Sequence, residues 1–182
     1  MPKYVNKWLW IIIGILGILL IILGSIRKPT DITHSLPVEV PVAGKWKSPP
    51  KVVICDDSLF SLRDVNIVID KWKSRGHRFD IIRKQKNCPY ENIDGIIFIR
   101  NIGIHMELDQ AGIAHTTLNK NTGEIFSSTI EIIDRNRLVL EHEIGHAIGY
   151  GHVDVKGHIM FHNTSGLGSN DDSLNYVDMK FK

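Results

Sequence analysis

The stretch HEIGHAIGYGH, from His142 to His152, constrains the fold of this 182-residue chain more than any other segment. On an α-helix, residues four positions apart lie about 40° apart around the axis, so His142 and His146 project side by side. Gly149 can take a positive φ without a steric penalty and can therefore end the helix. The chain then turns, and His152 can return toward the first two histidines. The sequence predicts a helix and a tight turn that bring three imidazoles together.

These side chains also have the chemistry of a metal site. Three neutral imidazoles suit Zn²⁺, and three protein ligands leave a fourth position for water, which is typical of catalytic zinc. We predict that His142, His146 and His152 bind one zinc ion. Glu143 is the predicted general base, because its carboxylate can take a proton from water that the metal activates. The alternative is a chance HExxH pattern on a charged helix, which the additional match at Gly149 and the third histidine argues against.

The full motif H-E-x-x-H-x-x-G-x-x-H resembles that of the metzincin zinc endopeptidases. It matches at His142, Glu143, His146, Gly149 and His152. Metzincins continue with a methionine-containing turn below the metal ligands, and Met160 in GHIMFH is similarly placed. The order of predicted elements over residues 51–182 is similar to a matrixin-type (matrix metalloproteinase-type) catalytic domain. The resemblance implies a metzincin-like zincin fold with a cleft, in which a peptide lies extended along an edge strand near Gly112 to Thr117.

The chain departs from the family pattern at two positions near the motif. Val153 follows the third histidine, where matrixins usually carry Ser and adamalysins Asp, so no subfamily is assigned. Astacins and serralysins carry Tyr two residues after the methionine, and this chain has His162 there. His162 is a candidate accessory ligand or proton donor, or alternatively an ordinary loop histidine. His158 is a weaker candidate.

A second, structural zinc is not expected. His105, Asp109 and His115 lie roughly where matrixins hold one, but the stretch that would carry a further histidine reads GEIFSS. Structural zinc sites are closed by four protein ligands, and four cannot be assembled here. The expected cofactor is therefore one catalytic Zn²⁺.

Hydrophobic patterning predicts an α+β fold with five strands and about three helices, and the resemblance to metzincins implies that the strands form a twisted, mixed sheet. An amphipathic helix around Val65 to Trp72 ends near Gly76. The active-site helix runs from about residue 134–136 to about Tyr150, and a short last helix lies within 169–181. The predicted strands are 51–55, 79–84, 94–100, 111–118 and 123–133, of which the last two form a hairpin through NKNTG.

The first fifty residues differ from the rest of the chain. The apolar run from Trp8 to Ile26 is long enough for a transmembrane helix, so residues 1–28 are predicted to be a membrane anchor that precedes the catalytic domain. A cleaved signal peptide or a buried core helix are the alternatives. Residues 29–50 hold five of the seven prolines and are predicted to be an extended linker.

Charge and membrane topology limit the partners. The net charge of +2 comes from mixed charges without a basic block, which argues against nucleic acid. The expected partners are a protein or peptide substrate and the membrane, through residues 8–26. We expect a single-pass protein with its domain on the extracytoplasmic side, because the short amino-terminal segment carries Lys3 and Lys7 and metzincins are mostly secreted or surface proteins. No feature indicates an oligomeric state.

Two cysteines, Cys55 and Cys88, stand away from any second cysteine or histidine at metal-ligand spacing. They form one disulfide if the compartment is oxidising, or they are two buried thiols, and the sequence leaves both open.

Three functions fit these observations. The first is a membrane-anchored zinc endopeptidase, and the second is a catalytically silent zinc- or peptide-binding module tethered to the membrane. A third is a structural membrane protein with incidental histidines. Glu143 favours the enzyme, because a scaffold has no chemical need for a carboxylate at that position.

Overall fold

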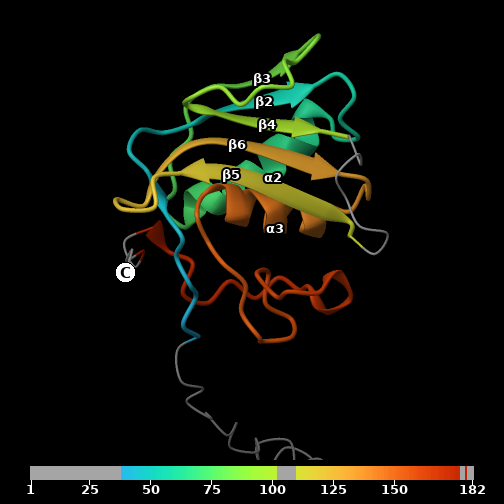
Figure 1. The fold of residues 1–182 in the computed structure, drawn as a ribbon. Coiled ribbons are helices and arrows are strands. Elements are labelled where there is room, and N and C mark those ends of the chain that lie inside the picture. Colours follow the sequence, from blue (N-terminus) through green and yellow to red (C-terminus); the bar gives the residue numbers. More distant parts are fainter. Residues whose placement is uncertain (1–37, 102–109, 177–178, 180–182) are drawn as a thin grey trace, which may run out of the picture. The chain divides into compact units, whose positions relative to one another are not determined.

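A computed structural model of the chain describes residues 38–101, 110–176 and 179 (Figure 1). The predicted anchor at 1–28, linker residues 29–37, and both His105 and Asp109 lie outside the described residues. Within the described ranges, no helix is long and apolar enough to cross a membrane.

The described residues belong to one compact unit built on a six-stranded, mostly parallel sheet. The strand order is β1-β6-β4-β2-β3, and β5 pairs with β6 as the antiparallel partner. The strands are β1 (Lys45–Trp46), β2 (Lys51–Cys55), β3 (Ile82–Gln85), β4 (Ile96–Arg100), β5 (Gly112–Leu118) and β6 (Glu124–Ile132). All five predicted strands are present, and β1 is an additional strand. The prediction of a mixed α and β fold is therefore confirmed, with one strand more than expected.

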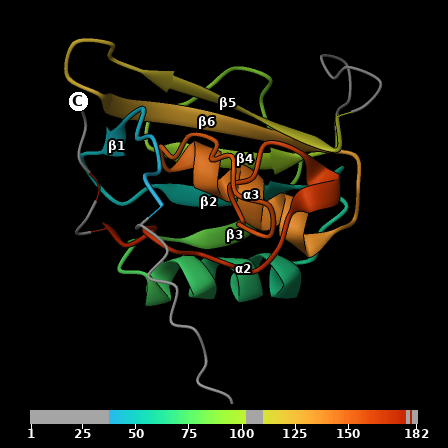
Figure 2. The same cartoon turned by 90° about the horizontal axis from the view of Figure 1, so that it is seen from below.

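Both α-helices cover the same face of the sheet, as Figures 1 and 2 show. Helix α2 (Leu62–Ser74) begins with a capping box, in which the Ser61 hydroxyl accepts from the Asp64 N–H and the Asp64 carboxylate accepts from the Ser61 N–H. Its buried stripe ends at Trp72, as the sequence predicted. Helix α3 (Arg137–Ala147) lies between the sheet and the chain that follows it (Figure 1).

The predicted last helix is wrong for residues 169–175, which are not helical and include a β-bridge at Asn170 and a turn at Asp172 and Ser173. Ser173 has a φ of +65°, which interrupts a right-handed helix. The carbonyls of Asn170, Asp172 and Leu174 accept hydrogen bonds from distant parts of the chain and are not used in helical bonds. Residues 177–178 and 180–182 lie outside the described residues. The described part of the chain thus has two α-helices, and a 3₁₀ turn, η1 (Thr164–Gly166), lies before its last segment.

Residues 38–50, which the sequence assigned to the linker, pack against the folded unit. Val38, Val40 and Val42 contact the main core, and β1 extends the sheet beside β6. Trp46 donates a hydrogen bond from Nε1 to the carbonyl of Ala147, at 2.8 Å. The apolar residues between the prolines alternate, which suits an extended segment lying on a core. The folded unit therefore includes residues that precede Lys51.

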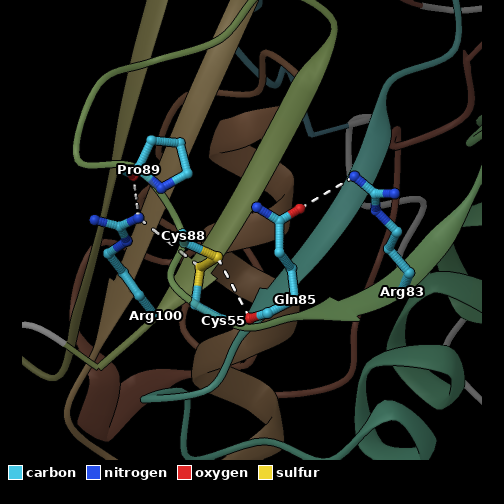
Figure 3. The surroundings of a disulfide bond; sticks show 6 residues. All are labelled: Cys55, Arg83, Gln85, Cys88, Pro89 and Arg100. Carbon is cyan, nitrogen blue, oxygen red and sulfur yellow. Dashed lines mark hydrogen bonds between the residues drawn. A yellow bond between two sulfur atoms is a disulfide. The ribbon is translucent and has the colours of Figure 1, made fainter.

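The opposite face of the sheet carries a disulfide between Cys55 and Cys88 (Figure 3). It joins the end of β2 to the segment after β3, across a sequence separation of 33 residues. The two sulfurs lie in a small second cluster with Val53 and Phe98. Of the two alternatives that the sequence left open, the structure has the disulfide.

Removing this cross-link should destabilise the protein. Closing a loop of this length lowers the entropy of the unfolded chain, so we expect Cys55→Ala/Cys88→Ala to lose about 3–4 kcal/mol of unfolding free energy. Urea denaturation would measure the loss. As a control, a reducing agent should destabilise the native protein and leave the double variant unchanged. Equal unfolding free energies for the two proteins would contradict the prediction.

Candidate metal centre

Helix α3 supplies the first two histidines of the site. Its N-cap is Asn136, whose side-chain oxygen accepts from the Leu138 N–H at 2.9 Å. Leu140 and Ile144 are fully buried in the main core. The helix ends at Ala147, three residues before the predicted end.

Gly149 ends the helix and turns the chain. Its φ of +109° is one that residues with a side chain rarely adopt. Its N–H donates to the His146 carbonyl at 3.0 Å, and its own carbonyl accepts from the Ala43 N–H at 2.8 Å. A Cβ at this position would overlap the carbonyl oxygen of Gly44. Only glycine therefore permits both the turn and the close approach of the residues before β1.

After this turn the three histidines converge. The Nε2 atoms of His142 and His146 lie 3.0 Å apart, those of His146 and His152 are 3.0 Å apart, and those of His152 and His142 are 3.3 Å apart. Tetrahedral zinc at about 2.0–2.1 Å from each nitrogen places the nitrogens roughly 3.3 Å apart, so the triangle has nearly the right size. Of the described His, Cys, Asp and Glu residues, these three converge closely enough to hold a metal ion.

Backbone carbonyls orient two of the imidazoles. His142 donates from Nδ1 to the Ile159 carbonyl at 2.7 Å, and His146 donates from Nδ1 to the Tyr150 carbonyl at 2.8 Å. Because a carbonyl only accepts, the ring proton must be on Nδ1 in both cases. The lone pair is then on Nε2 and points to the centre of the triangle, which is the arrangement of metal-binding histidines.

Burial keeps the ligands neutral. It lowers the pKa of His142 to about 3 and that of His146 to about 4, and neighbouring histidines lower both further. The pKa of His152 is also lowered, mainly by burial and then by the nearby His162. Neutral imidazole is the form that binds a metal, so the protein holds its ligands ready near pH 7.

Glu143 follows His142 in α3 and is buried, and burial raises the pKa of its carboxyl to about 8. Its Oε2 has no hydrogen-bond partner among the described residues. A buried charge without a partner is costly, and a cation bound nearby would offset that cost. The orphaned carboxylate therefore fits a metal ion in the adjacent triangle.

Gly112, at the start of β5, makes room for this carboxylate. A Cβ there would lie 2.9 Å from Oε1 of Glu143 and 3.0 Å from a methyl of Val139. The sequence places Gly112 on the edge strand, but this contact was not predicted. A glycine within a strand is a signal of close backbone approach, so the contact could have been suspected.

Met160 lies beneath α3, fully buried, where a Cβ on Gly145 would overlap its sulfur. Its N–H donates to Nδ1 of His158 at 2.9 Å, and Nε2 of His158 donates to the Asp172 carbonyl at 3.0 Å. His158 is also fully buried. This histidine was a weak candidate in the sequence, but it holds the backbone at the methionine.

The other candidate histidines are not members of the triangle. His162 is 53% exposed, and its Nδ1 lies 3.7 Å from a carboxylate oxygen of Asp154. His115 is exposed on β5.

Comparisons of the chain with models of protein families, with curated proteins and with solved structures found no match.

The turn at Gly149 can be tested against a second glycine. Gly157 has a φ of +88°, and a Cβ added there would meet no atom within 4 Å, so it shares the backbone strain without the crowding. We expect Gly157→Ala to cost about 1 kcal/mol of unfolding free energy. Gly149→Ala should cost about 3 kcal/mol, because it adds overlap with the backbone of Gly44. Equal losses in thermal or urea unfolding would contradict the close approach.

The metal-free protein should be most stable near pH 6.5. Burial lowers the pKa of His77 to about 4, as it lowers those of His142 and His146. Unfolding takes up protons at these groups below pH 6.5, so their contribution to stability is lost as the pH falls toward 4. Glu143 acts in the opposite direction. Its pKa of about 8 exceeds the ordinary value of 4.5, so stability falls as the pH rises toward 8.

Below pH 6.5 the effect of His77, His142 and His146 on stability exceeds the opposite effect of Glu143. Above pH 6.5 only the effect of Glu143 remains. Urea unfolding in a chelator at several pH values would measure the profile. Glu143→Gln should remove the decline between pH 6.5 and 8 and keep the acid limb. An unchanged alkaline limb in that variant would contradict the assignment to Glu143.

Proposed function

We propose that this chain is a membrane-anchored, zinc-dependent endopeptidase in which His142, His146 and His152 bind the metal and Glu143 is the general base. The observation that carries the proposal is the convergence of three neutral imidazoles, with the buried Glu143 next to His142 in α3 and its Oε2 without a hydrogen-bond partner among the described residues. The metzincin-like motif is consistent with this arrangement.

Zinc is the metal that suits the ligands best. The group consists of three imidazoles, without a thiolate or carboxylate. Imidazole nitrogens suit Zn²⁺, and three protein ligands are typical of catalytic zinc sites. Three protein ligands leave a position open for water or substrate. When bound there, zinc would supply a Lewis acid that polarises a peptide carbonyl and makes water acidic enough to lose a proton near neutral pH.

Glu143 would move the proton. Its carboxylate takes a proton from water as the water oxygen bonds to the carbonyl carbon, and it delivers that proton to the leaving nitrogen as the C–N bond breaks. Burial strengthens this carboxylate as a base by raising its pKa, whereas a nearby cation lowers the pKa again and keeps the group ionised before reaction. The two effects together favour a base that works near neutral pH.

The edge strand β5 offers a place for the substrate backbone. It pairs with β6 on one side, and no described strand pairs with its other edge. Its first residue is Gly112, where an added Cβ would lie 2.9 Å from Oε1 of Glu143. A peptide that lies extended along β5 would add a strand to the sheet and bring one of its peptide bonds close to Glu143. Backbone pairing of this kind favours an endopeptidase.

A membrane location outside the cytoplasm is part of the proposal. The apolar run of residues 8–26 has the length of a membrane span. The Cys55–Cys88 disulfide supports an oxidising compartment, because disulfides persist outside the cytosol. Both features agree with a domain on the extracytoplasmic side.

Replacing Glu143 separates metal binding from catalysis. The full-length chain, purified in detergent, should carry about one zinc per chain both as the native protein and as Glu143→Gln. Cleavage of a peptide library should fall by about 10²–10⁴-fold in Glu143→Gln, because the general base is lost. Glu91→Gln is the matched control, since Glu91 is exposed and distant in sequence from the motif.

Two outcomes would contradict the proposal in different ways. Zinc in all three proteins without cleavage by the native chain would favour the tethered binding module. Native protein without bound zinc after loading would remove the metal site itself.

A further inference from the structure

The residue whose carbonyl orients His142, Ile159, is itself bonded to the segment Asn170–Leu174. The carbonyl oxygen of Ile159 accepts a hydrogen bond from Nδ1 of His142, at 2.7 Å. The N–H of the same Ile159 donates to the Asn170 carbonyl, also at 2.7 Å. Movement of Asn170 would therefore shift Ile159, whose carbonyl orients the His142 ring.

The second ligand is tied to the same segment. His146 donates from Nδ1 to the Tyr150 carbonyl at 2.8 Å, and the Tyr150 hydroxyl donates to the Leu174 carbonyl at 2.8 Å. Between these two points, His158 donates to the Asp172 carbonyl at 3.0 Å. Alternate carbonyls of one short segment thus support both ligand-orienting residues and the turn that carries Met160.

This segment has little regular structure to hold it in place. It is not helical, and Ser173 takes a positive φ. Asn170 forms a β-bridge with His158, and the following residues contact the end of α2, where Arg75 is the C-cap residue. Arg75 donates from Nε to the Asp171 carboxylate at 2.7 Å, and its carbonyl accepts from the Tyr176 N–H at 2.9 Å.

Arg75 also reaches the helix that carries the ligands. Its Nη2 donates to Glu141 at 2.9 Å, and Glu141 directly precedes His142 in α3. Glu141 is 1% exposed and is also bonded to Lys71, at 2.6 Å. The Arg75 guanidinium is mostly buried and lies over the Trp72 ring, 4.6 Å from its centroid. One planar group therefore joins α2, α3 and the C-terminal segment.

We propose that the Arg75–Asp171 ion pair is a positioning clamp for the metal centre. By fixing Asn170–Leu174 against α2 and α3, it keeps the His142 and His146 rings at the angles at which their Nε2 atoms meet. Neither Arg75 nor Asp171 touches the metal. The inference rests on the metal binding of the proposed function and is independent of peptide hydrolysis.

The test compares two neighbouring aspartates in the full-length chain. Asp171→Asn removes the charge from the clamp. Asp172→Asn makes the same change one residue later, at an exposed side chain whose carboxylate has no ion-pair partner among the described residues. The readouts are zinc affinity by competition with a chelating indicator, the visible spectrum of the Co²⁺-loaded protein, and the unfolding free energy of the metal-free protein.

We expect Asp171→Asn to bind zinc about tenfold more weakly and to change the Co²⁺ spectrum, as loss of outer-shell support does in other metal sites. Asp172→Asn should match the native protein in both readouts. Asp171→Glu, which keeps the charge, should retain more affinity than Asp171→Asn. If Asp171→Asn does not fold, Arg75→Lys tests the pair from the other side, because lysine cannot bridge both carboxylates.

Three results would overturn the clamp. In the first, Asp171→Asn loses stability while its affinity and spectrum stay native, which would show a purely structural ion pair. In the second, Asp172→Asn loses as much affinity as Asp171→Asn, which would show a general effect of charge. In the third, the native chain binds no zinc, and the proposed function then fails as well. The first two results leave the proposed function standing.

Discussion

The close approach of two glycines, Gly44 and Gly149, is the constraint on which the rest of the structure depends. Because Gly149 has no side chain, it can end α3 with a positive φ and let the backbone before β1 pass against the turn. The turn sends the chain back so that His152 meets the two histidines of α3. The same contact brings residues 38–46 onto the core, where Trp46 bonds to the last residue of α3. One small turn therefore determines both the metal-ligand geometry and where the folded unit begins.

Two glutamates of α3 illustrate how the protein distributes buried charge. Glu141 and Glu143 are both almost fully buried, but Glu141 is bonded to Lys71 and Arg75, whereas Oε2 of Glu143 has no partner among the described residues. The paired carboxylate joins α2 to α3. The carboxyl of Glu143 has a raised pKa, and Glu143 directly follows His142 in α3. A buried group without full compensation at this position is consistent with the proposed role of Glu143 as general base.

Much of the fold followed from local patterns in the sequence. The apolar, β-branched runs of β2 and β4 and the stripe of α2 that ends at Trp72 were predictable because each buries a face with a regular period. The predicted helix at 169–181 failed for its described part, because aspartates that could open a helix here belong to a turn whose carbonyls bond to Ile159, His158 and Tyr150. The packing of residues 38–50 was missed because their prolines suggested a free linker, whereas the alternating valines contact the core.

The sequence by itself determined which side chains could bind a metal and which could act as a base, since HExxH spacing on a helix places them by periodicity alone. It also determined the turn, through a glycine at position 149. Tertiary structure decided the rest, because it depends on residues far apart in the chain. Only the packed fold brings Gly112 against Glu143, supports His142 and His146 through the carbonyls of 170–174, and joins Arg75 to both Glu141 and Asp171. Contacts of this kind leave no local period in a sequence, and they arise when buried polar groups must find partners across the core.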